Sequence, residues 1–229
     1  MSVSPDAGEV AGHRVVRAGP ALSHASRAVM LVHGRGGAPE DMLRLAERLA
    51  LPDVAWLAPA APDRSWWPSS FLAPLGHNEP GLSTGLDALG AVHAEIRAAG
   101  VAPERTLVLG FSQGACLALE YGARSGEVRG GIVALSGGLV GTADLDEPPR
   151  EALYGHAGKA FEYACRLDDV PVFIGCHETD PHIPLERVRE SERVVTALGA
   201  RVSVEIYPGA GHGIVEEELR RVRGLLNRP

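Results

Sequence analysis

The chain of 229 residues contains only three cysteines, Cys116, Cys165 and Cys176, and no Cys-x-x-Cys pair. An odd number without paired spacing argues against a disulfide framework. It favours reduced, buried thiols, which are typical of a cytoplasmic protein.

Basic charge and long apolar runs are also missing. The formal net charge is -7 at pH 7, whereas a nucleic-acid-binding protein needs a basic face. No apolar run approaches the roughly 20 residues of a membrane helix. The start, Met1 to Asp6, has neither the basic patch nor the apolar core of a signal peptide. We therefore expect a cytoplasmic protein with no nucleic-acid and no membrane partner.

Strand-like and helix-like segments alternate from about residue 28 to the end of the chain. The expected strands are 28–32, 54–57, 106–109, 131–135, 170–175 and 202–207. The helix patterns between them predict a mostly parallel sheet with helices on both faces. We expect one domain over residues 1–229, with 1–12 as a loose lead-in, 13–17 as an edge strand and a helix within 151–165.

The sequence Gly110-Phe111-Ser112-Gln113-Gly114 follows one of these apolar strands and precedes a helix-forming segment. This layout is typical of a nucleophile elbow, in which a serine lies on a tight strand-to-helix turn with its hydroxyl projecting from the sheet edge. The two glycines fit because a side chain there would collide with the neighbouring strand and helix. Ser112 is therefore the predicted nucleophile.

A serine hydroxyl needs a base, and the base needs an acid that orients it. In enzymes with such an elbow the partners follow in the order nucleophile, acid, base. His212, in a loop of small residues after the last strand, is the predicted base. Asp180, past the preceding strand, is the predicted acid, with Glu178 as the nearest competitor. Taken singly, the Asp is a common turn former and the His a common surface residue; their order and strand ends favour a triad.

A tetrahedral intermediate also needs backbone N–H groups that face its oxyanion. The residue after the nucleophile, Gln113, supplies one such amide. The glycine-rich loop 33–37 follows the first buried strand, and the amide of Arg35 is the expected second donor. A phosphate-binding loop is a weaker interpretation, because no Gly-Lys-Ser/Thr follows and the dinucleotide-binding spacing is absent.

Two further clusters have competing interpretations. His177, Glu178, Asp180 and His182 lie close in sequence, but adjacent loop positions rarely converge on one ion, so no metal site is predicted. Aromatic residues make up only 5% of the chain, and they gather with a leucine at Trp66, Trp67, Phe71 and Leu72. This segment either packs on its own apolar side chains or forms the wall of a substrate pocket beside the serine.

Four motifs together resemble those of the phospholipase/carboxylesterase family of α/β-hydrolases, which includes the acyl-protein thioesterases. They are Leu31-Val32-His33-Gly34-Arg35-Gly36, Gly110-Phe111-Ser112-Gln113-Gly114, Asp180-Pro181-x-Ile183-Pro184 and Tyr207-Pro208-Gly209-x-Gly211-His212. The resemblance implies an α/β-hydrolase fold without a large cap domain, a Ser112/Asp180/His212 triad, oxyanion amides at Arg35 and Gln113, and no cofactor. Homodimers occur in that family.

The resemblance implies hydrolysis of carboxylic esters or thioesters. Thioesterase members usually carry leucine where this chain has Arg35, and the segments 66–80 and 144–168 also differ from theirs. We therefore expect a cytoplasmic carboxylesterase that acts on small-molecule esters through an acyl-enzyme. An acyl-protein thioesterase or lysophospholipase for long acyl chains is the alternative enzyme, and a hydrolase-like binding protein without turnover is the alternative of another class.

Overall fold

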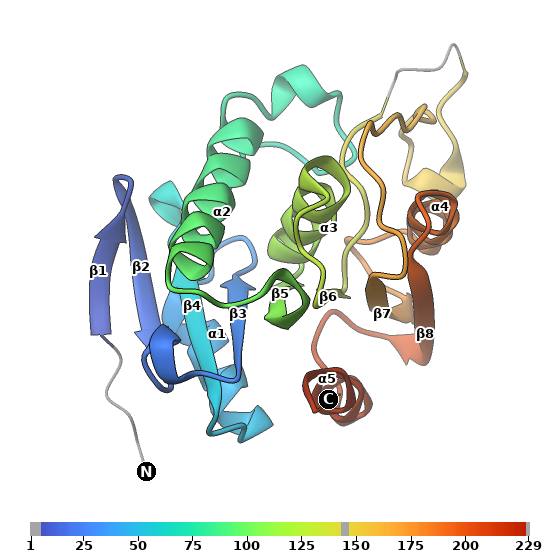
Figure 1. Ribbon diagram of the computed structural model, residues 1–229. Coiled ribbons are helices and arrows are strands. Elements are labelled where there is room, and N and C mark those ends of the chain that lie inside the picture. The colour runs from blue at the N-terminus through green and yellow to red at the C-terminus, as the bar shows by residue number, and fades with distance from the viewer. Residues whose placement is uncertain (1–5, 143–146, 228–229) are drawn as a thin grey trace.

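The computed structural model describes residues 6–142 and 147–227, which build one eight-stranded sheet flanked by helices (Figure 1). The strands are β1 (Asp6–Val10), β2 (His13–Ala18), β3 (Arg27–Val32), β4 (Val54–Pro59), β5 (Thr106–Phe111), β6 (Gly131–Leu135), β7 (Pro171–Thr179) and β8 (Arg201–Ala210). Their order across the sheet is β1-β2-β4-β3-β5-β6-β7-β8. Strands β3 to β8 pair in parallel, and β2 pairs antiparallel with both β1 and β4. The predicted mostly parallel α/β fold is confirmed.

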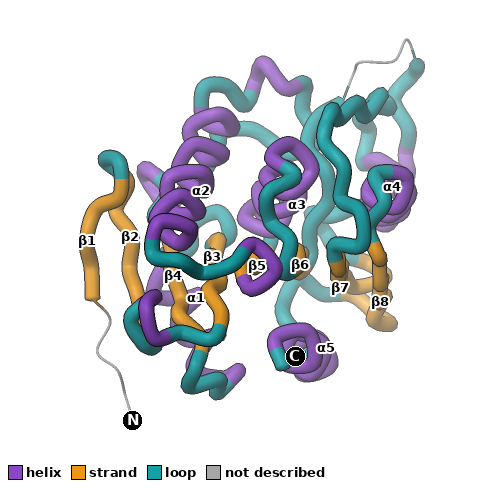
Figure 2. Tube along the Cα trace, viewed as in Figure 1, coloured by secondary structure: helices purple, strands orange, loops and turns teal. Residues whose placement is uncertain are grey.

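Five α-helices cover the two faces of the sheet, and Figure 2 shows them on its opposite sides. They are α1 (Pro39–Leu49), α2 (Gly81–Ala98), α3 (Gln113–Ser125), α4 (Leu185–Ala197) and α5 (Glu216–Leu226). Helices α1 and α5 lie on one face, whereas α2, α3 and α4 lie on the other (Figure 1). The described residues contain no separate cap domain.

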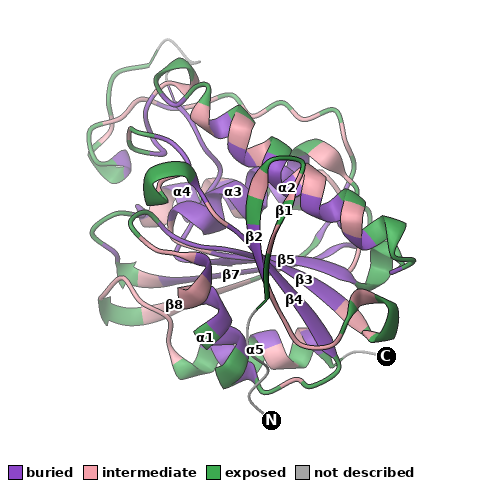
Figure 3. Cartoon of the chain, turned by 90° about the vertical axis from the view of Figure 1, so that its left-hand side faces the viewer, coloured by how far each residue is buried: buried purple, intermediate pink, exposed green. Residues whose placement is uncertain are grey.

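The apolar side chains form one core on each face because successive residues of a strand point to opposite sides. Along β3, for example, Val29 and Leu31 join the core under α1 and α5, while Met30 and Val32 join the core under α2, α3 and α4. All four are fully buried. Figure 3 shows the central strands buried between the helical layers. This double coverage explains why the strands read as continuous apolar runs in the sequence.

Two local expectations were wrong. Residues 6–12, expected within a loose lead-in, form β1 and a tight turn, so β1 rather than β2 is the edge strand; residues 1–5 lie outside the described part. No α-helix forms between residues 151 and 165. A short 3-10 turn spans Glu151–Leu153, and Arg150 and His156 close a small antiparallel bridge. The remaining residues of that segment run extended over the α3–α4 layer (Figure 1).

Candidate active site

Ser112 occupies the sharp turn between β5 and α3. Its backbone dihedrals, φ 55° and ψ -122°, lie in a region that residues other than glycine rarely adopt. The Ser112 N–H donates to the carbonyl of Leu135 at 2.9 Å, which ties the turn to β6. A Cβ at Gly110 would lie 2.0 Å from the Gly114 carbonyl oxygen, and one at Gly114 would lie 2.1 Å from the Val32 carbonyl oxygen. The elbow therefore depends on both glycines, for the steric reason expected.

His212 lies in the loop between β8 and α5 and contacts both other predicted members of the site. Its Nε2 is 2.8 Å from Ser112 Oγ, and its Nδ1 is 2.8 Å from Asp180 Oδ2. A carboxylate can only accept, so the proton belongs on Nδ1, and Nε2 is left to accept from the serine hydroxyl. The rings of Phe111 and His182 pack against the imidazole at centroid distances of 5.2 and 4.8 Å.

Asp180 follows β7 and is 1% exposed. Its Oδ1 accepts the backbone N–H groups of His182 at 2.8 Å and Ile183 at 3.1 Å. Burial alone raises the pKa of this carboxyl, but the hydrogen bond from His212 and the two N–H groups outweigh it and leave the pKa lowered. Asp180 is thus a buried carboxylate that keeps its charge. The competitor, Glu178, is exposed and lies outside this chain of hydrogen bonds.

The glycine-rich loop after β3 packs directly on the elbow. A Cβ at Gly34 would lie 3.1 Å from Ser112 Cβ. The imidazole of His33 holds the loop: its Nε2 accepts the Ala61 N–H at 3.1 Å, so its Nδ1 donates to the Gly34 carbonyl at 2.8 Å. Burial lowers the pKa of His33, which keeps the ring neutral for both bonds. Within the described residues, the backbone amides of Arg35 and Gln113 donate to no acceptor.

A cavity of about 460 Å³ opens at this point. It is lined by Gly34, Arg35, Trp67, Pro68, Ser69, Ser70, Phe71, Phe111, Ser112, Gln113, Cys116, His182, Ile183 and His212. Of the four predicted pocket residues, Trp67 and Phe71 belong to this lining. Trp66 and Leu72 do not, although all four side chains are buried in the same core. The Trp66 Nε1–H donates to the His33 carbonyl at 2.8 Å, so Trp66 supports the loop from behind.

Two side chains shape this cavity in a way that the sequence did not reveal. The Gln113 amide group accepts the Trp66 N–H and donates to the Trp67 carbonyl, both at 2.9 Å. The Arg35 guanidinium donates to the carbonyls of Pro68 at 2.8 Å and Ser69 at 2.5 Å. Both therefore pin the segment after β4 against the elbow. A polar residue at the start of a buried helix is a weak signal of such a role, because its partner lies far away in sequence.

The residues that suggested a metal site point in different directions. Asp180 bonds to His212, His182 lines the cavity, and the His177 ring lies under Gly211, where a Cβ would approach it to 2.9 Å. In residues 6–142 and 147–227 no group of three or more His, Cys, Asp or Glu is placed to hold a metal ion.

In the same residues no helix is both long and apolar enough to cross a membrane. Burial raises the pKa of the Cys116 thiol in the cavity wall to about 12, so this thiol stays protonated.

Comparison with known proteins gives one consistent family. The profile of the phospholipase/carboxylesterase family matches residues 13–228. A phospholipase/carboxylesterase of Dyadobacter fermentans has a similar structure, with a TM-score of 0.81 and 34% identity; the alignment covers 97% of this chain and 100% of that one.

Two curated relatives have related names. Acyl-protein thioesterase 1 of Gibberella zeae is 35% identical over 132 residues, which are 56% of this chain and 50% of the relative. The matched region thus spans about half of that thioesterase. Carboxylesterase SOBER1 of Arabidopsis thaliana is 27% identical over 220 residues, which cover 87% of this chain and 89% of the relative.

Proposed function

The chain belongs to the phospholipase/carboxylesterase family, and from this premise we propose that it is a serine esterase for small to medium acyl or aryl esters. The observation that carries the proposal is the unbroken chain of hydrogen bonds from Ser112 through His212 to Asp180, with the serine end open to a cavity. The Asp180 carboxylate keeps its charge, and its bond to Nδ1 leaves Nε2 of His212 facing the serine hydroxyl, as these roles require.

In the first half of the reaction, His212 Nε2 takes the hydroxyl proton as Ser112 Oγ attacks the acyl carbon. The imidazolium then forms beside the buried Asp180 carboxylate, which stabilises it. The amides of Arg35 and Gln113 donate to the oxyanion of the tetrahedral intermediate. Losing one such donor typically costs a factor of about 100 to 1,000 in rate. The protonated His212 finally gives its proton to the departing alkoxide, and an acyl-enzyme remains.

In the second half, His212 removes a proton from the water that attacks the acyl carbon, and it returns this proton to Ser112 Oγ as the bond to the acyl group breaks and the acid leaves. The same amides stabilise the second oxyanion. No step needs a cofactor, because proton transfer and backbone donors supply all the chemistry.

An esterase for long acyl chains is the second candidate, because the relative of Gibberella zeae is named as an acyl-protein thioesterase. The segment that lines the cavity separates the two candidates. The Arg35 guanidinium lies across the backbone of Pro68 and Ser69, so a polar, exposed cation occupies a wall along which a long alkyl chain would gain nothing. This favours the shorter substrates.

The test is kcat/KM for p-nitrophenyl esters from acetate to palmitate. We expect a maximum at short chains and a loss of roughly 10⁴- to 10⁶-fold in Ser112→Ala. Ser125→Ala, at the other end of the same helix, is the matched control and should keep the wild-type rates. A maximum at long chains would transfer the proposal to the second candidate. Equal, feeble rates in wild type and Ser112→Ala would instead identify a binding protein without turnover.

A further inference from the structure

The lining of the catalytic cavity is unusual in charge for a chain with a formal net charge of -7. Its fourteen residues include Arg35, His182 and His212 but no Asp and no Glu. Asp180, the carboxylate of the proposed triad, has a fully buried side chain behind His212. Its oxygens accept hydrogen bonds from the imidazole and from two backbone N–H groups. A ligand in the cavity therefore meets cationic and N–H donor groups without a compensating carboxylate.

The Arg35 cation and the two imidazoles reach the cavity from both sides of the elbow. Arg35 follows β3, which neighbours β5 on one side. His182 and His212 follow β7 and β8, which lie beyond β6 on the other side. A substrate whose ester carbon lies at Ser112 can therefore extend toward Arg35 while His212 keeps its access to the leaving group.

The Arg35 guanidinium has donors left over after its structural bonds. It carries five N–H groups, and its acceptors in the protein are two neutral carbonyls, those of Pro68 and Ser69. Among the described residues no carboxylate forms an ion pair with it, in contrast to Arg14 and Arg17, which pair with Glu40 and Glu95. Its charge is thus not neutralised by any carboxylate in the described part of the chain.

Two features prepare this guanidinium for an anion. Its two carbonyl bonds hold the planar group in one orientation, so little side-chain freedom remains to be lost on binding. The side chain is exposed at the cavity, so the guanidinium is accessible, and it remains charged although partial desolvation lowers the pKa of Arg35. A carboxylate can accept two parallel N–H bonds from such a fork.

We propose that the Arg35 side chain recognises a carboxylate carried by the substrate, so that the substrates are esters bearing an acid group. This deepens the proposed esterase function and rests on it. The carboxylate can belong to the acyl part, as in a hemi-ester of a dicarboxylic acid, or to the alcohol part, as in an ester of a hydroxy acid. The rival role for Arg35 is a purely structural one, in which it only ties the loop after β3 to the Pro68–Ser69 backbone.

The experiment compares acid and amide forms of the same ester. Monomethyl glutarate and methyl glutaramate test the acyl side, and O-butanoyl glycolate and O-butanoyl glycolamide test the alcohol side. The measured quantity is the ratio of kcat/KM for acid over amide in wild type, Arg35→Met and Arg35→Lys. This ratio cancels any effect of the substitution on the backbone amide of residue 35.

We expect the acid to be preferred by about tenfold on one of the two sides, as for one charge-assisted hydrogen-bonded pair. The acid-over-amide ratio should fall to about one or below in Arg35→Met. In Arg35→Lys it should lie between the wild-type and Arg35→Met values, because lysine keeps the charge but lacks the paired N–H groups of a guanidinium. Added salt should reduce the wild-type ratio. The matched control is Arg64→Met, which removes a cation that bonds the Gly37 carbonyl outside the lining and should leave the ratio unchanged.

Two results would overturn the proposal: a wild-type ratio of one on both sides, or rates for acid and amide that fall by the same factor in Arg35→Met. Arg35 would then keep only its structural role, which is to hold the loop after β3 against the Pro68–Ser69 backbone. If wild type hydrolyses no ester at all, the proposed function fails. The Arg35 proposal is then decided by calorimetry with the same two pairs as ligands. Tighter binding of an acid than of its amide, lost in Arg35→Met, supports it, and equal or absent binding contradicts it.

Discussion

Two buried carboxyl groups lie near β7, and their surroundings are opposite. Asp180 and Glu218 are each 1% exposed. Asp180 bonds to an imidazole and two backbone N–H groups, and its pKa is lowered. For Glu218, burial raises the pKa to about 7; the Val215 N–H at 2.8 Å opposes the shift, and the nearby charge of Glu205 adds to it. Burial thus raises the pKa of a carboxyl, and several converging donors are needed to lower it.

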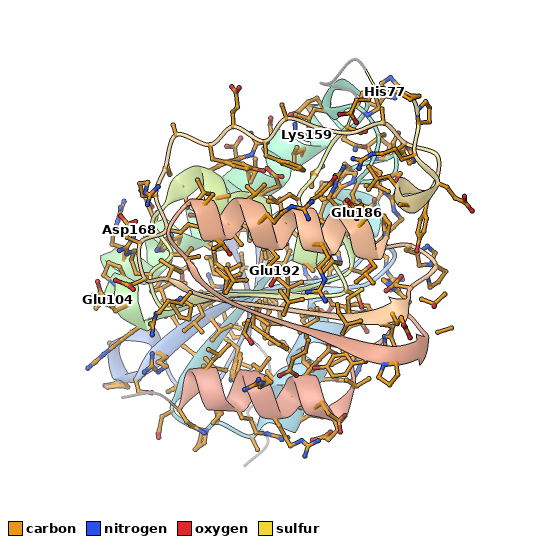
Figure 4. The ribbon with its side chains drawn as sticks, turned by 90° about the vertical axis from the view of Figure 1, so that its right-hand side faces the viewer. His77, Glu104, Lys159, Asp168, Glu186 and Glu192 are labelled. Carbon is orange, nitrogen blue, oxygen red and sulfur yellow. The ribbon has the colours of Figure 1, made fainter. Side chains whose placement is uncertain are left out.

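Strand β7 lies between these two groups, and both affect the pKa of its residue Cys176. Burial raises the pKa of Cys176 to about 12, and the charges of Asp180 and Glu218 contribute in that order. One residue earlier, Gly175 makes room for Glu218, because a Cβ there would lie 2.2 Å from Glu218 Oε1. Figure 4 shows this end of the molecule, with α4, on which Glu186 and Glu192 are labelled, and α5 on opposite sides of β8. The comparison supports the proposed role of Asp180 as the acid and gives Glu218 the role of a packed carboxyl.

The largest expected effect is that of Asp180→Asn. An asparagine can donate to His212 Nδ1, and the ring proton then lies on Nε2. A protonated Nε2 cannot accept a hydrogen bond from the Ser112 hydroxyl. We expect kcat to fall by about 10⁴-fold, as for the same change in a Ser-His-Asp protease. The measurement is steady-state hydrolysis of the best p-nitrophenyl ester. Glu178→Gln, an exposed neighbour, is the control with unchanged rate; a loss of less than tenfold in Asp180→Asn would contradict the assigned acid.

Glu218→Gln should change the pH dependence of stability. The folded-state pKa of Glu218 is about 7, above the ordinary value of 4.5, so the native state holds this proton more tightly than the unfolded chain. Stability then falls as pH rises from about 4.5 to 7, by up to about 3 kcal/mol. The lowered pKa of Asp180 acts in the opposite direction and at lower pH, where stability is lost as that carboxyl is protonated.

The measurement is urea unfolding of wild type and Glu218→Gln from pH 5 to 8. We expect the variant to lose less stability across that range than wild type does. Glu217→Gln, whose exposed carboxylate pairs with Arg220, is the control that should keep the wild-type slope. Parallel curves for wild type and Glu218→Gln would show that Glu218 is ionised throughout the range.

Gly175→Ala tests the packing of Glu218 rather than its charge. The new methyl group would lie against Glu218 Oε1, and such overpacking typically costs about 1–3 kcal/mol. In a Glu218→Ala background the same substitution should cost clearly less, because its obstacle is gone. A double-mutant cycle in urea measures this coupling. Additive losses would show that the two side chains do not meet.

Tyr154→Phe has the smallest expected effect. The Tyr154 hydroxyl donates to the backbone carbonyl of Asp180, although the ring is 47% exposed. Losing a half-exposed neutral hydrogen bond typically costs about 1 kcal/mol. The free energy of unfolding in urea at pH 7 measures it. A loss as large as that of Gly175→Ala would mean that this tyrosine holds the Asp180 segment more firmly than one bond explains.

The sequence predicted most of the sheet and every member of the hydrogen-bonded chain. Strands buried on both faces appear in the sequence as continuous apolar runs, and the strand expected over residues 131–135 matches β6. The prediction from sequence failed where the chain has no local pattern. The strand β1 is mostly exposed and has no apolar run, and it forms only because β2 pairs with it. The segment 151–165 has helix-compatible residues, yet the bonds that fix it run to distant partners, such as Tyr163 to Glu120 at 2.9 Å.

The sequence alone predicted the three residues of the proposed triad: Ser112, Asp180 and His212. Their order and their positions after three parallel strands follow from chain connectivity, because the carboxyl ends of such strands meet at one edge of the sheet. Only the tertiary structure decided that Trp67 lines the cavity while Trp66 does not, that the pKa of Glu218 is raised, and that the Arg35 cation pairs with no carboxylate of the described residues. Those properties arise from contacts between residues far apart in the chain, such as Gln113 with a segment 46 and 47 positions earlier, and solvent exclusion and charge pairing exist only once these contacts have formed.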